Sequence, residues 1–280
     1  MSAIPDIDLD HVAVAVEEQA SAWPRYAGDL GGQWLAGGAE TGFSAAQVRY
    51  ANGMKVEVLE PYAVERNDFL RRFLDRSGPG PHHLTFKVAD IALALELVEA
   101  AGYRPVNVNI DYPEWKEAFI HPKDAPGVVV QLAQAAGSWQ SSPPEGFPAS
   151  RLDEPARLVH VGHAVADLDE GLRLFVELLG GKEIDGGADH DLRWVDLAWP
   201  GPGRVRLLEA TSTASAVAAW VGERAGRVHH LAFAVAQPRH VADAVAIGDE
   251  VFEVEPDANL GARLLLAAPT EAPFPRPLAG

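Results

Sequence analysis

The stretch His11-Val12-Ala13-Val14-Ala15-Val16 decides the fold of this chain, because it is a strand and also one copy of a repeat. Its valines alternate with a histidine and two alanines, a pattern typical of a β-strand with two different faces. We expect the valine face to pack against helices, and the histidine face to leave room for a bound group. A near copy of the stretch, HVGHAV, follows at residues 160–165, displaced by 149 positions.

Two further segments repeat at almost the same offset. Residues 82–88, HHLTFKV, return as HHLAFAV 147 positions later, and residues 55–60, KVEVLE, return as RVRLLE 149 positions later. Three matches at nearly one offset indicate a tandem duplication. Between the copies lies a Pro-, Ser- and Gly-rich segment without apolar periodicity. The sequence therefore predicts a first domain at 1–136, a linker at 137–156, a second domain at 157–268 and a Pro-rich tail at 269–280.

Each domain contains a second, internal repeat of a strand, a helix and further strands. In the first domain one helical stretch ends at Gly31-Gly32, and another begins at the N-cap Asp90 and ends at Gly102. In the second domain Asp167 and Gly180-Gly181 bound the corresponding helix. The prediction is an α+β fold of four βαβββ units, two in each domain.

The composition excludes several classes of protein. The formal net charge is -17, which disfavours binding to nucleic acid or to anionic membranes. The chain has no cysteine, so disulfides, thiolate ligands and a cysteine nucleophile are excluded. No apolar run reaches the roughly 20 residues of a membrane-spanning helix, and the N-terminus does not resemble a signal peptide. We therefore expect a cytoplasmic protein.

Four residues that can bind metal occupy equivalent places in the strands of the first domain. His11 precedes Glu57 by 46 residues, and His83 precedes Gln131 by 48. Each of them interrupts a strand whose other face is apolar. Nitrogen and oxygen donors without sulfur suit divalent zinc, cobalt, nickel, manganese or iron. One such residue alone is more often a buried, hydrogen-bonded side chain, but four at repeated spacings predict a divalent metal site.

The segments HVAVAV, KVEVLEP, HHLTFKV and WKEAFIHPKDAPGVVVQLAQ resemble the vicinal-oxygen-chelate superfamily, and are most similar to methylmalonyl-CoA epimerases and glyoxalase-like proteins. The resemblance covers residues 8–134 well and 157–268 more loosely. It implies that each pair of units forms a half-open β cup with helices outside, and that the metal ligands are His11, Glu57, His83 and Gln131. It also implies proton removal next to a metal-chelated carbonyl, through an enediolate.

The resemblance further assigns individual roles and exposes one departure. Glu40 matches the glutamate that handles the proton in the epimerases, so Glu40 and Glu57 are the predicted catalytic residues. Lys116 and Lys123 border the cup and are candidates to receive an anionic substrate group. Epimerases of this kind usually have glutamate where this chain has Gln131. The amide removes a negative charge and an acid/base group, which puts epimerisation itself in doubt.

The second domain does not retain the full set of metal ligands. His160 and His230 remain, but Arg206 stands in place of Glu57 and Leu265 in place of Gln131. Arginine does not bind a metal cation. The interval from His230 to Leu265 is 35 residues instead of 48, so we expect that a strand or loop has been trimmed. We expect a degenerate cup with a structural or substrate-covering role.

These observations leave several functions open. The leading one is a metal-dependent isomerase or lyase of epimerase or glyoxalase type, acting on a small carbonyl or acyl-CoA-like substrate. One alternative is an extradiol-type ring-cleaving dioxygenase, although such enzymes usually hold iron in the second domain. Others are a drug-binding protein of the bleomycin-resistance kind and an inactive relative that still binds substrate. A homodimer is compatible with this organisation, but is not needed to complete the site.

Overall fold

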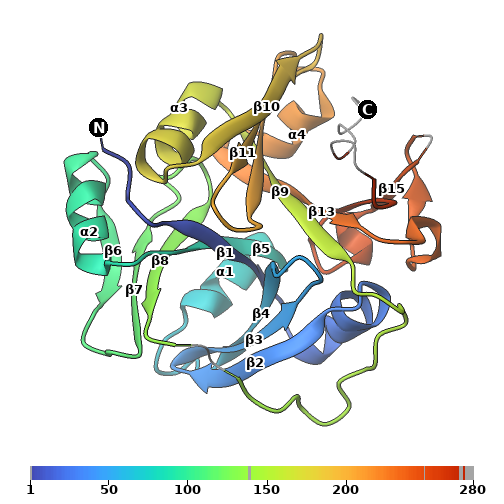
Figure 1. The fold of residues 1–280 in the computed structure, drawn as a ribbon, viewed down its shortest axis with the longest axis horizontal. Helices are drawn as coiled ribbons and strands as arrows, with labels where there is room; N and C mark the ends of the chain where they lie inside the picture. Colours follow the sequence, from blue (N-terminus) through green and yellow to red (C-terminus); the bar gives the residue numbers. More distant parts are fainter. Residues whose placement is uncertain (1, 138–139, 249, 271–273, 275–280) are drawn as a thin grey trace.

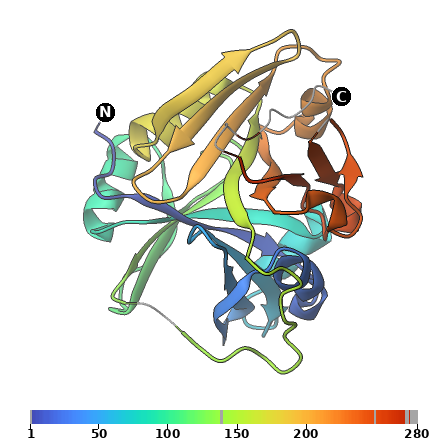
Figure 2. The same cartoon turned by 45° about the vertical axis from the view of Figure 1, so that its right-hand side comes forward.

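The strands of this protein form two eight-stranded sheets, one in each half of the chain (Figure 1). The computed structural model describes residues 2–137, 140–248, 250–270 and 274. The first half, blue to green, lies below the second half, yellow to red, in both views (Figure 2). The predicted α+β architecture of tandem units is confirmed.

The first half contains two βαβββ units. The first unit comprises β1 (Asp8–Ala15), the 3-10 helix η1 (Gln19–Ser21), the π-helix η2 (Pro24–Asp29), β2 (Gln33–Glu40), β3 (Gly42–Arg49) and β4 (Lys55–Tyr62). The helix α1 (Phe69–Ser77) connects it to the second unit, which comprises β5 (Gly80–Lys87), α2 (Ile91–Ala100), β6 (Pro105–Asn109), β7 (Trp115–Ile120) and β8 (Val129–Ala135). The first unit thus has two short helices where the sequence predicts one.

The second half repeats this order with one reduction. The third unit comprises β9 (Arg157–Val165), α3 (Leu168–Leu172), the π-helix η3 (Arg173–Leu178), β10 (Lys182–Ala188), β11 (Leu192–Ala198) and β12 (Arg204–Ala210), and is followed by α4 (Ala216–Val221). The fourth comprises β13 (Gly226–Ala234), the 3-10 helix η4 (Pro238–His240), β14 (Val245–Ala246), β15 (Val251–Val254), the 3-10 helix η5 (Pro256–Ala258) and β16 (Leu264–Ala267). The chain between β13 and β14 is too short for a full helix, so one three-residue turn replaces it.

The predicted helix signals act where the sequence places them. The Asp90 carboxylate accepts hydrogen bonds from the backbone N–H groups of Ala92 and Leu93, and Asp167 caps α3 in the same way. Beyond α2, Gly102 adopts a φ of 85°, in the left-handed region that side chains with a Cβ rarely occupy. The local sequence thus fixes the start and end of these helices.

Both sheets have the same strand order. In the first it is β2-β3-β4-β1-β5-β8-β7-β6, and in the second it is β10-β11-β12-β9-β13-β16-β15-β14. The strand that begins each domain lies at the centre, parallel to the last strand of its own unit and antiparallel to the first strand of the next. The two units of a domain therefore meet at β1 and β5, or at β9 and β13.

The two faces of β1 meet different environments, as the alternation predicts. Val12 and Val14 are fully buried with Tyr26 and Leu30 of the η2 region, in a core that also includes residues of the second half. On the histidine face, by contrast, Ala13 and Ala15 pack in a small cluster with Leu59, Leu70 and Leu74. Helix α1 therefore covers the Ala15 end of this face, and the His11 end is left to polar residues.

The segment predicted as a linker follows the outside of the first domain (Figure 2). Between residues 140 and 156 the structure contains no helix or strand. The segment is nevertheless packed: the Trp34 indole donates to the Ser141 carbonyl oxygen at 2.8 Å, and the Phe147 ring lies 5.3 Å from that of Trp34. Of the predicted tail, Pro269, Thr270 and Phe274 are described, and its other residues lie outside the described ranges.

The backbones of the two domains contact each other at two equivalent pairs of glycines. Gly80, at the start of β5, lies against Gly261, which precedes β16; Gly226, at the start of β13, lies against Gly127, which precedes β8. A Cβ added to Gly127 would lie 1.8 Å from the Gly226 carbonyl oxygen, and one added to Gly261 would lie 1.8 Å from the Pro79 carbonyl oxygen. The two halves are therefore joined through backbone contacts that repeat with the duplication.

In the part of the chain that the structure covers, no helix combines the length and the apolar character needed to cross a membrane.

Candidate metal centre

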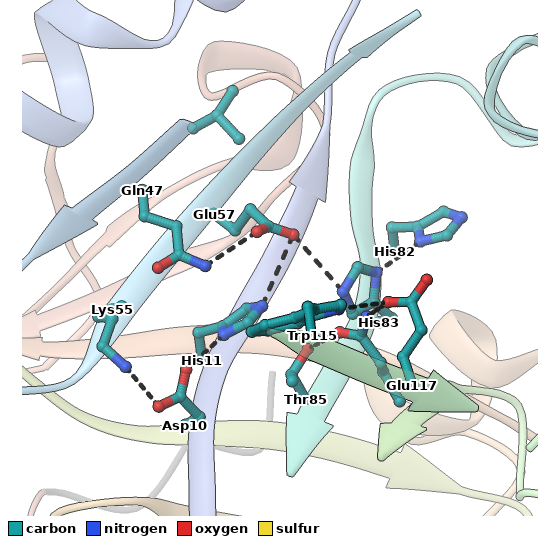
Figure 3. A network of polar contacts seen from close by, with 12 residues as sticks. Asp10, His11, Gln47, Lys55, Glu57, His82, His83, Thr85, Trp115 and Glu117 are labelled. Atoms are coloured by element: carbon teal, nitrogen blue, oxygen red, sulfur yellow. Dashed lines mark hydrogen bonds and ion pairs between the residues drawn. The ribbon is translucent and has the colours of Figure 1, made fainter. Parts of the chain in front are cut away.

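Three of the four predicted ligands converge on one point of the first cup (Figure 3). The Nε2 atoms of His11 and His83 each lie 3.6 Å from Oε2 of Glu57. Both histidines are buried, and the Glu57 side chain is only 12% exposed. Neither Nε2 atom has a hydrogen-bond partner among the residues that the structure describes. Two buried imidazole nitrogens are thus directed at one carboxylate without a geometric hydrogen bond to it.

The sheet register explains this convergence. Ala13 of β1 pairs with Glu57 of β4 on one side and with His83 of β5 on the other. These three residues therefore form one row across the sheet, and His11 lies two positions along β1 on the same face. Ala13 is small, so the side chains of Glu57 and His83 can approach each other over it.

The arrangement fits a divalent metal ion. The candidate ligand atoms of His11, Glu57 and His83 all lie within 4.8 Å of one another. Ligands that bind an ion at about 2.1 Å in tetrahedral or octahedral geometry are about 3 to 3.5 Å apart, close to the 3.6 Å separations here. A buried polar atom without a partner is costly, and an ion between these three groups would satisfy both nitrogens.

Gln131 lies beside this group, in hydrogen bonds to its neighbours. It pairs with Thr85 of β5, and its Oε1 atom accepts a 2.5 Å hydrogen bond from the Thr85 hydroxyl. Its Nε2 atom donates to Oε2 of Glu117 at 2.7 Å. Because an ionised carboxylate only accepts hydrogen bonds, Glu117 fixes which end of the amide is the nitrogen. Gln131 as a fourth ligand remains a proposal.

Two further side chains orient the histidines. The Asp10 carboxylate lies 2.7 Å from His11 Nδ1 and 2.5 Å from the Lys55 ammonium. His82 Nδ1 lies 2.9 Å from His83 Nδ1. His82 is the extra residue of a β-bulge, since Ala13 pairs with His83 but Val14 pairs with Pro81. With both Nδ1 atoms engaged, the Nε2 atoms face the centre, as metal-binding histidines require.

The charges of the centre are strongly coupled. Burial opposes a charge on His11, but the Glu57 and Asp10 carboxylates outweigh it and raise the pKa of His11 to about 9. Burial likewise opposes a charge on Glu57, yet His11, His83 and the Gln47 amide hold its pKa well below the usual value. The pKa of His83 is lowered well below its usual value by burial and by the neighbouring His82. Without metal, His11 and Glu57 form a buried ion pair and His83 is neutral.

The other predicted site residues lie elsewhere in the first domain. Glu40 is exposed at the end of β2, where it pairs with Phe43 across the β2–β3 turn, and the residue opposite Glu57 on β3 is Gln47. Lys116 alternates with Glu117 on β7, so it faces the same side as the buried Ala118. Lys123 is exposed in the turn after β7. Their predicted roles remain predictions.

Sequence reasoning missed the polar residues that surround the ligands. The Gln47 amide donates to Glu57 Oε1 at 2.9 Å, and the Trp115 indole donates to Glu117 Oε2 at 2.8 Å. Asp10, Lys55 and Thr85 complete this set. The sequence holds one signal for two of these residues. Trp115 and Glu117 alternate with Lys116 and Ala118, and Ala118 belongs to the apolar face of β7, so Trp115 and Glu117 belong to the opposite face.

The second cup has the same geometry with different chemistry. The register places Arg206 opposite Gly162 as it places Glu57 opposite Ala13, and Leu265 opposite Ala232 as Gln131 opposite Thr85. The Arg206 guanidinium donates to both oxygens of Asp196 at 2.6 and 2.7 Å. The His160 and His230 Nε2 atoms lie only 3.0 Å apart. Each of these Nε2 atoms has the other as its hydrogen-bond partner, and a guanidinium stands in place of the carboxylate ligand, so the second cup lacks the ligand set of the first.

A pocket of about 360 Å³ lies beneath the linker, lined by residues that include Trp34 and Phe147. None of the four predicted ligands lines it.

Comparison with known proteins identifies relatives of this chain. The family model of the Glyoxalase/Bleomycin resistance protein/Dioxygenase superfamily matches residues 10–119. The ethylmalonyl-CoA/methylmalonyl-CoA epimerase of Cereibacter sphaeroides is 30% identical over 132 residues, 45% of this chain and 96% of the relative. The mitochondrial methylmalonyl-CoA epimerase of Homo sapiens is 33% identical over 132 residues, 45% of this chain and 73% of the relative.

A solved structure extends the likeness of fold to both domains. A variant of 4-hydroxymandelate synthase from Streptomyces coelicolor superposes with a TM-score of 0.64, at 14% identity, over 95% of each chain. This likeness concerns the fold alone. The sequence relatives and the tandem βαβββ architecture together establish that this chain belongs to the glyoxalase/bleomycin resistance/dioxygenase superfamily, the vicinal-oxygen-chelate proteins.

Proposed function

We propose that this protein is a metal-dependent isomerase or lyase that moves a proton next to a carbonyl group of its substrate. One observation carries the proposal: the Nε2 atoms of His11 and His83 are directed at Glu57 and have no hydrogen-bond partner among the described residues. His11, Glu57 and His83 would hold a divalent ion, with Gln131 as a fourth ligand through its amide oxygen. A bound ion would act as a Lewis acid toward the carbonyl oxygen.

Proton transfer also requires a base near the ligands. Glu117 lies on the face of β7 that carries Trp115 and contacts Gln131. Its Oε2 atom accepts two hydrogen bonds, and its Oε1 atom has no hydrogen-bond partner among the described residues. Glu117 is therefore our first candidate for the base. Glu40, which the resemblance implies, is the second, and its place at the exposed end of β2 would require the hairpin to lie differently when substrate is bound.

The names of the sequence relatives supply the first substrate class to test. Both curated relatives are named as acyl-CoA epimerases, so methylmalonyl-CoA is the first compound to test. Protein reconstituted with Co²⁺ is incubated with methylmalonyl-CoA in D₂O, and deuterium at C2 is measured by mass spectrometry. We expect exchange that a chelator abolishes. The variant E117Q should slow exchange by about 100-fold or more if Glu117 is the base, whereas E40Q should have this effect if Glu40 is. An absence of metal-dependent exchange would argue against an epimerase acting on this substrate.

A second function is favoured by the donor set itself. Two histidines and one carboxylate are the ligands of many non-haem ferrous oxygenases. Protein reconstituted anaerobically with Fe²⁺ should then consume oxygen when a catechol is added. Oxygen uptake together with an absence of deuterium exchange would establish this function in place of the first.

A further inference from the structure

Lys87 lies on the cup face of β5, beyond the metal centre. His83, Thr85 and Lys87 alternate along this strand, and they pair with Val129, Gln131 and Ala133 of β8 in register. Ala133 in turn pairs with Glu117 of β7. Lys87 therefore belongs to the same face as the ligands, four residues along β5 from His83. That separation corresponds to about 13 Å of strand, part of which the long side chain can span.

The Lys87 ammonium contacts an aromatic ring rather than an acid. Its Nζ atom lies 4.0 Å from the centre of the Trp115 ring. No carboxylate lies within ion-pair distance of it in the residues that the structure describes. Burial lowers the pKa of Lys87, while the Asp10 and Glu57 carboxylates act on it only through space. A half-buried cation without an anion is uncommon in a chain with a net charge of -17.

The acidic groups nearby are already engaged. Asp10 lies between Lys55 and His11, and Glu57 faces both imidazoles. Glu117 accepts hydrogen bonds from Trp115 and Gln131. The same Trp115 side chain thus supports Lys87 with its ring and Glu117 with its indole N–H. None of these carboxylates forms an ion pair with the Lys87 ammonium among the residues that the structure describes, so Lys87 can receive a carboxylate that the protein does not supply.

We propose that Lys87 and Trp115 form a subsite for a carboxylate of the substrate, adjacent to the metal centre. This inference rests on the proposed function, because it assumes that the carbonyl end of the same molecule is held at His11, Glu57 and His83. It defines the substrate class as a carbonyl compound that carries a free carboxylate a few bonds away. The acidic groups around Lys87 favour a singly charged carboxylate over a dianionic phosphate. Lys116, on the opposite face of β7, would not take part.

The test separates the two ends of the ligand. Hydroxamates chelate metal ions through two vicinal oxygens, so acetohydroxamate probes the centre alone. A series of hydroxamates that carry a carboxylate after one, two or three methylene groups probes the centre and the subsite together. Binding to the Co²⁺-loaded protein is measured by calorimetry for the wild type and for K87M. K182M removes the same charge from the exposed strand β10 in the second half of the chain and is the matched control.

We expect at least one carboxylated hydroxamate to bind the wild type about tenfold more tightly than acetohydroxamate does. In K87M this advantage should disappear, while acetohydroxamate binding changes less than twofold; K182M should behave as the wild type. If acetohydroxamate binds but no carboxylate improves binding, or if K87M keeps the advantage, the subsite is wrong and the metal centre stands. If no hydroxamate binds the loaded protein, both the centre and the subsite are wrong.

Discussion

At the level of single residues, protonation of His11 stabilises the metal-free centre. His11 is protonated and Glu57 ionised, and both are buried beside the neutral His83. The His11 pKa is raised from 6.5 to about 9, so its contribution to folding stability is complete below about 6.5 and is lost as pH rises toward 9. The Glu57 pKa is lowered from 4.5, so its contribution is present above about 4.5 and is lost as pH falls. The metal-free protein should therefore gain most from this pair between these limits.

This proton must leave when a metal ion binds, because a ligating imidazole nitrogen is deprotonated. We predict that at pH 7.5 the chelator-treated protein releases about one proton for each Co²⁺ ion bound. The apparent affinity should rise about tenfold for each pH unit between 6.5 and 9. Calorimetric titration in two buffers with different ionisation enthalpies measures the number of protons. A binding enthalpy that does not depend on the buffer would contradict a charged His11.

Residue types and spacing were sufficient to propose His11, Glu57 and His83, because β-strand alternation places residues of equal parity on one face. They were not sufficient for Lys87 or Glu117. Lys87 is the last residue of β5, and its position over Trp115 depends on how β7 and β8 pair with β5. Lys116 was proposed from its charge and its neighbourhood, but the register places it on the apolar side of β7. The face of the sheet on which a residue lies can be predicted from the sequence only when the ends of its strand are known.

At the level of elements, pairing of equivalent strands shows how the second cup differs. In the first cup the paired residues are Gln47 of β3 and Glu57 of β4, and in the second cup they are Asp196 of β11 and Arg206 of β12. The carboxylate therefore lies on the last strand of the unit in the first cup and on the strand before it in the second. Ala13 of β1 corresponds to Gly162 of β9. The absence of a side chain at Gly162 lets the His230 ring lie over β9 and contact His160. An ion pair and two touching imidazoles thus fill the space of the metal centre.

This close contact predicts the effect of adding one methyl group. A Cβ at Gly162 would lie 2.1 Å from His230 Cε1, and the His230 ring is fully buried. We expect Gly162→Ala to lower the free energy of unfolding by about 1 to 3 kcal/mol, measured by urea denaturation. The reciprocal change, Ala13→Gly, opens space in the first cup and should cost only about 0.5 to 1 kcal/mol. A neutral Gly162→Ala would mean that His230 has another position available.

The elements themselves were predicted with uneven success. The glycine and aspartate signals located the ends of α2 and the start of α3, because capping depends on local backbone chemistry. The sequence predicted that a strand or loop was trimmed in the fourth unit. The structure shows shorter strands, with two residues in β14 and four in β15 against five in β6 and six in β7, and also a reduction of the helix to the turn η4, which was not predicted. The division of the first helical stretch into η1 and η2 was not foreseen. A local signal for it is present, because Pro24 is the first residue of η2 and has no backbone N–H to continue the preceding helical turn.

At the level of the whole molecule, the duplication determines how the domains associate. Their main apolar core includes residues of both halves, so neither domain buries its valine face alone. The glycine pairs Gly80–Gly261 and Gly127–Gly226 allow the two backbones to touch where the domains cross. The repeat therefore predicted that both halves are built from the same units, as the two sheets of equal strand order show. The repeat did not predict this interface, because the contacts between the glycines are long-range and no local sequence pattern specifies them.

The glycine crossing gives a prediction for the association of the domains. Gly127 has a φ of 75° and no room for a Cβ beside the Gly226 backbone. Gly127→Ala should destabilise the protein by at least about 3 kcal/mol, because neither backbone can move without disturbing the other domain. Gly102→Ala is the matched control: its φ is 85°, but no atom lies within 4 Å of the added Cβ, so strain alone should cost about 1 kcal/mol. If urea denaturation shows that both variants lose the same free energy of unfolding, the backbone contact between Gly127 and Gly226 is contradicted.

The central claim is that one cup of this duplicated protein holds a metal ion and the other does not. The most direct measurement is the number of Co²⁺ ions bound by chelator-treated wild type and by the equivalent variants His11→Ala and His160→Ala, with circular dichroism to verify folding. The account predicts one ion per chain for the wild type and for His160→Ala, and none bound with comparable affinity by His11→Ala. Two ions per chain, or a full site in folded His11→Ala, would contradict it.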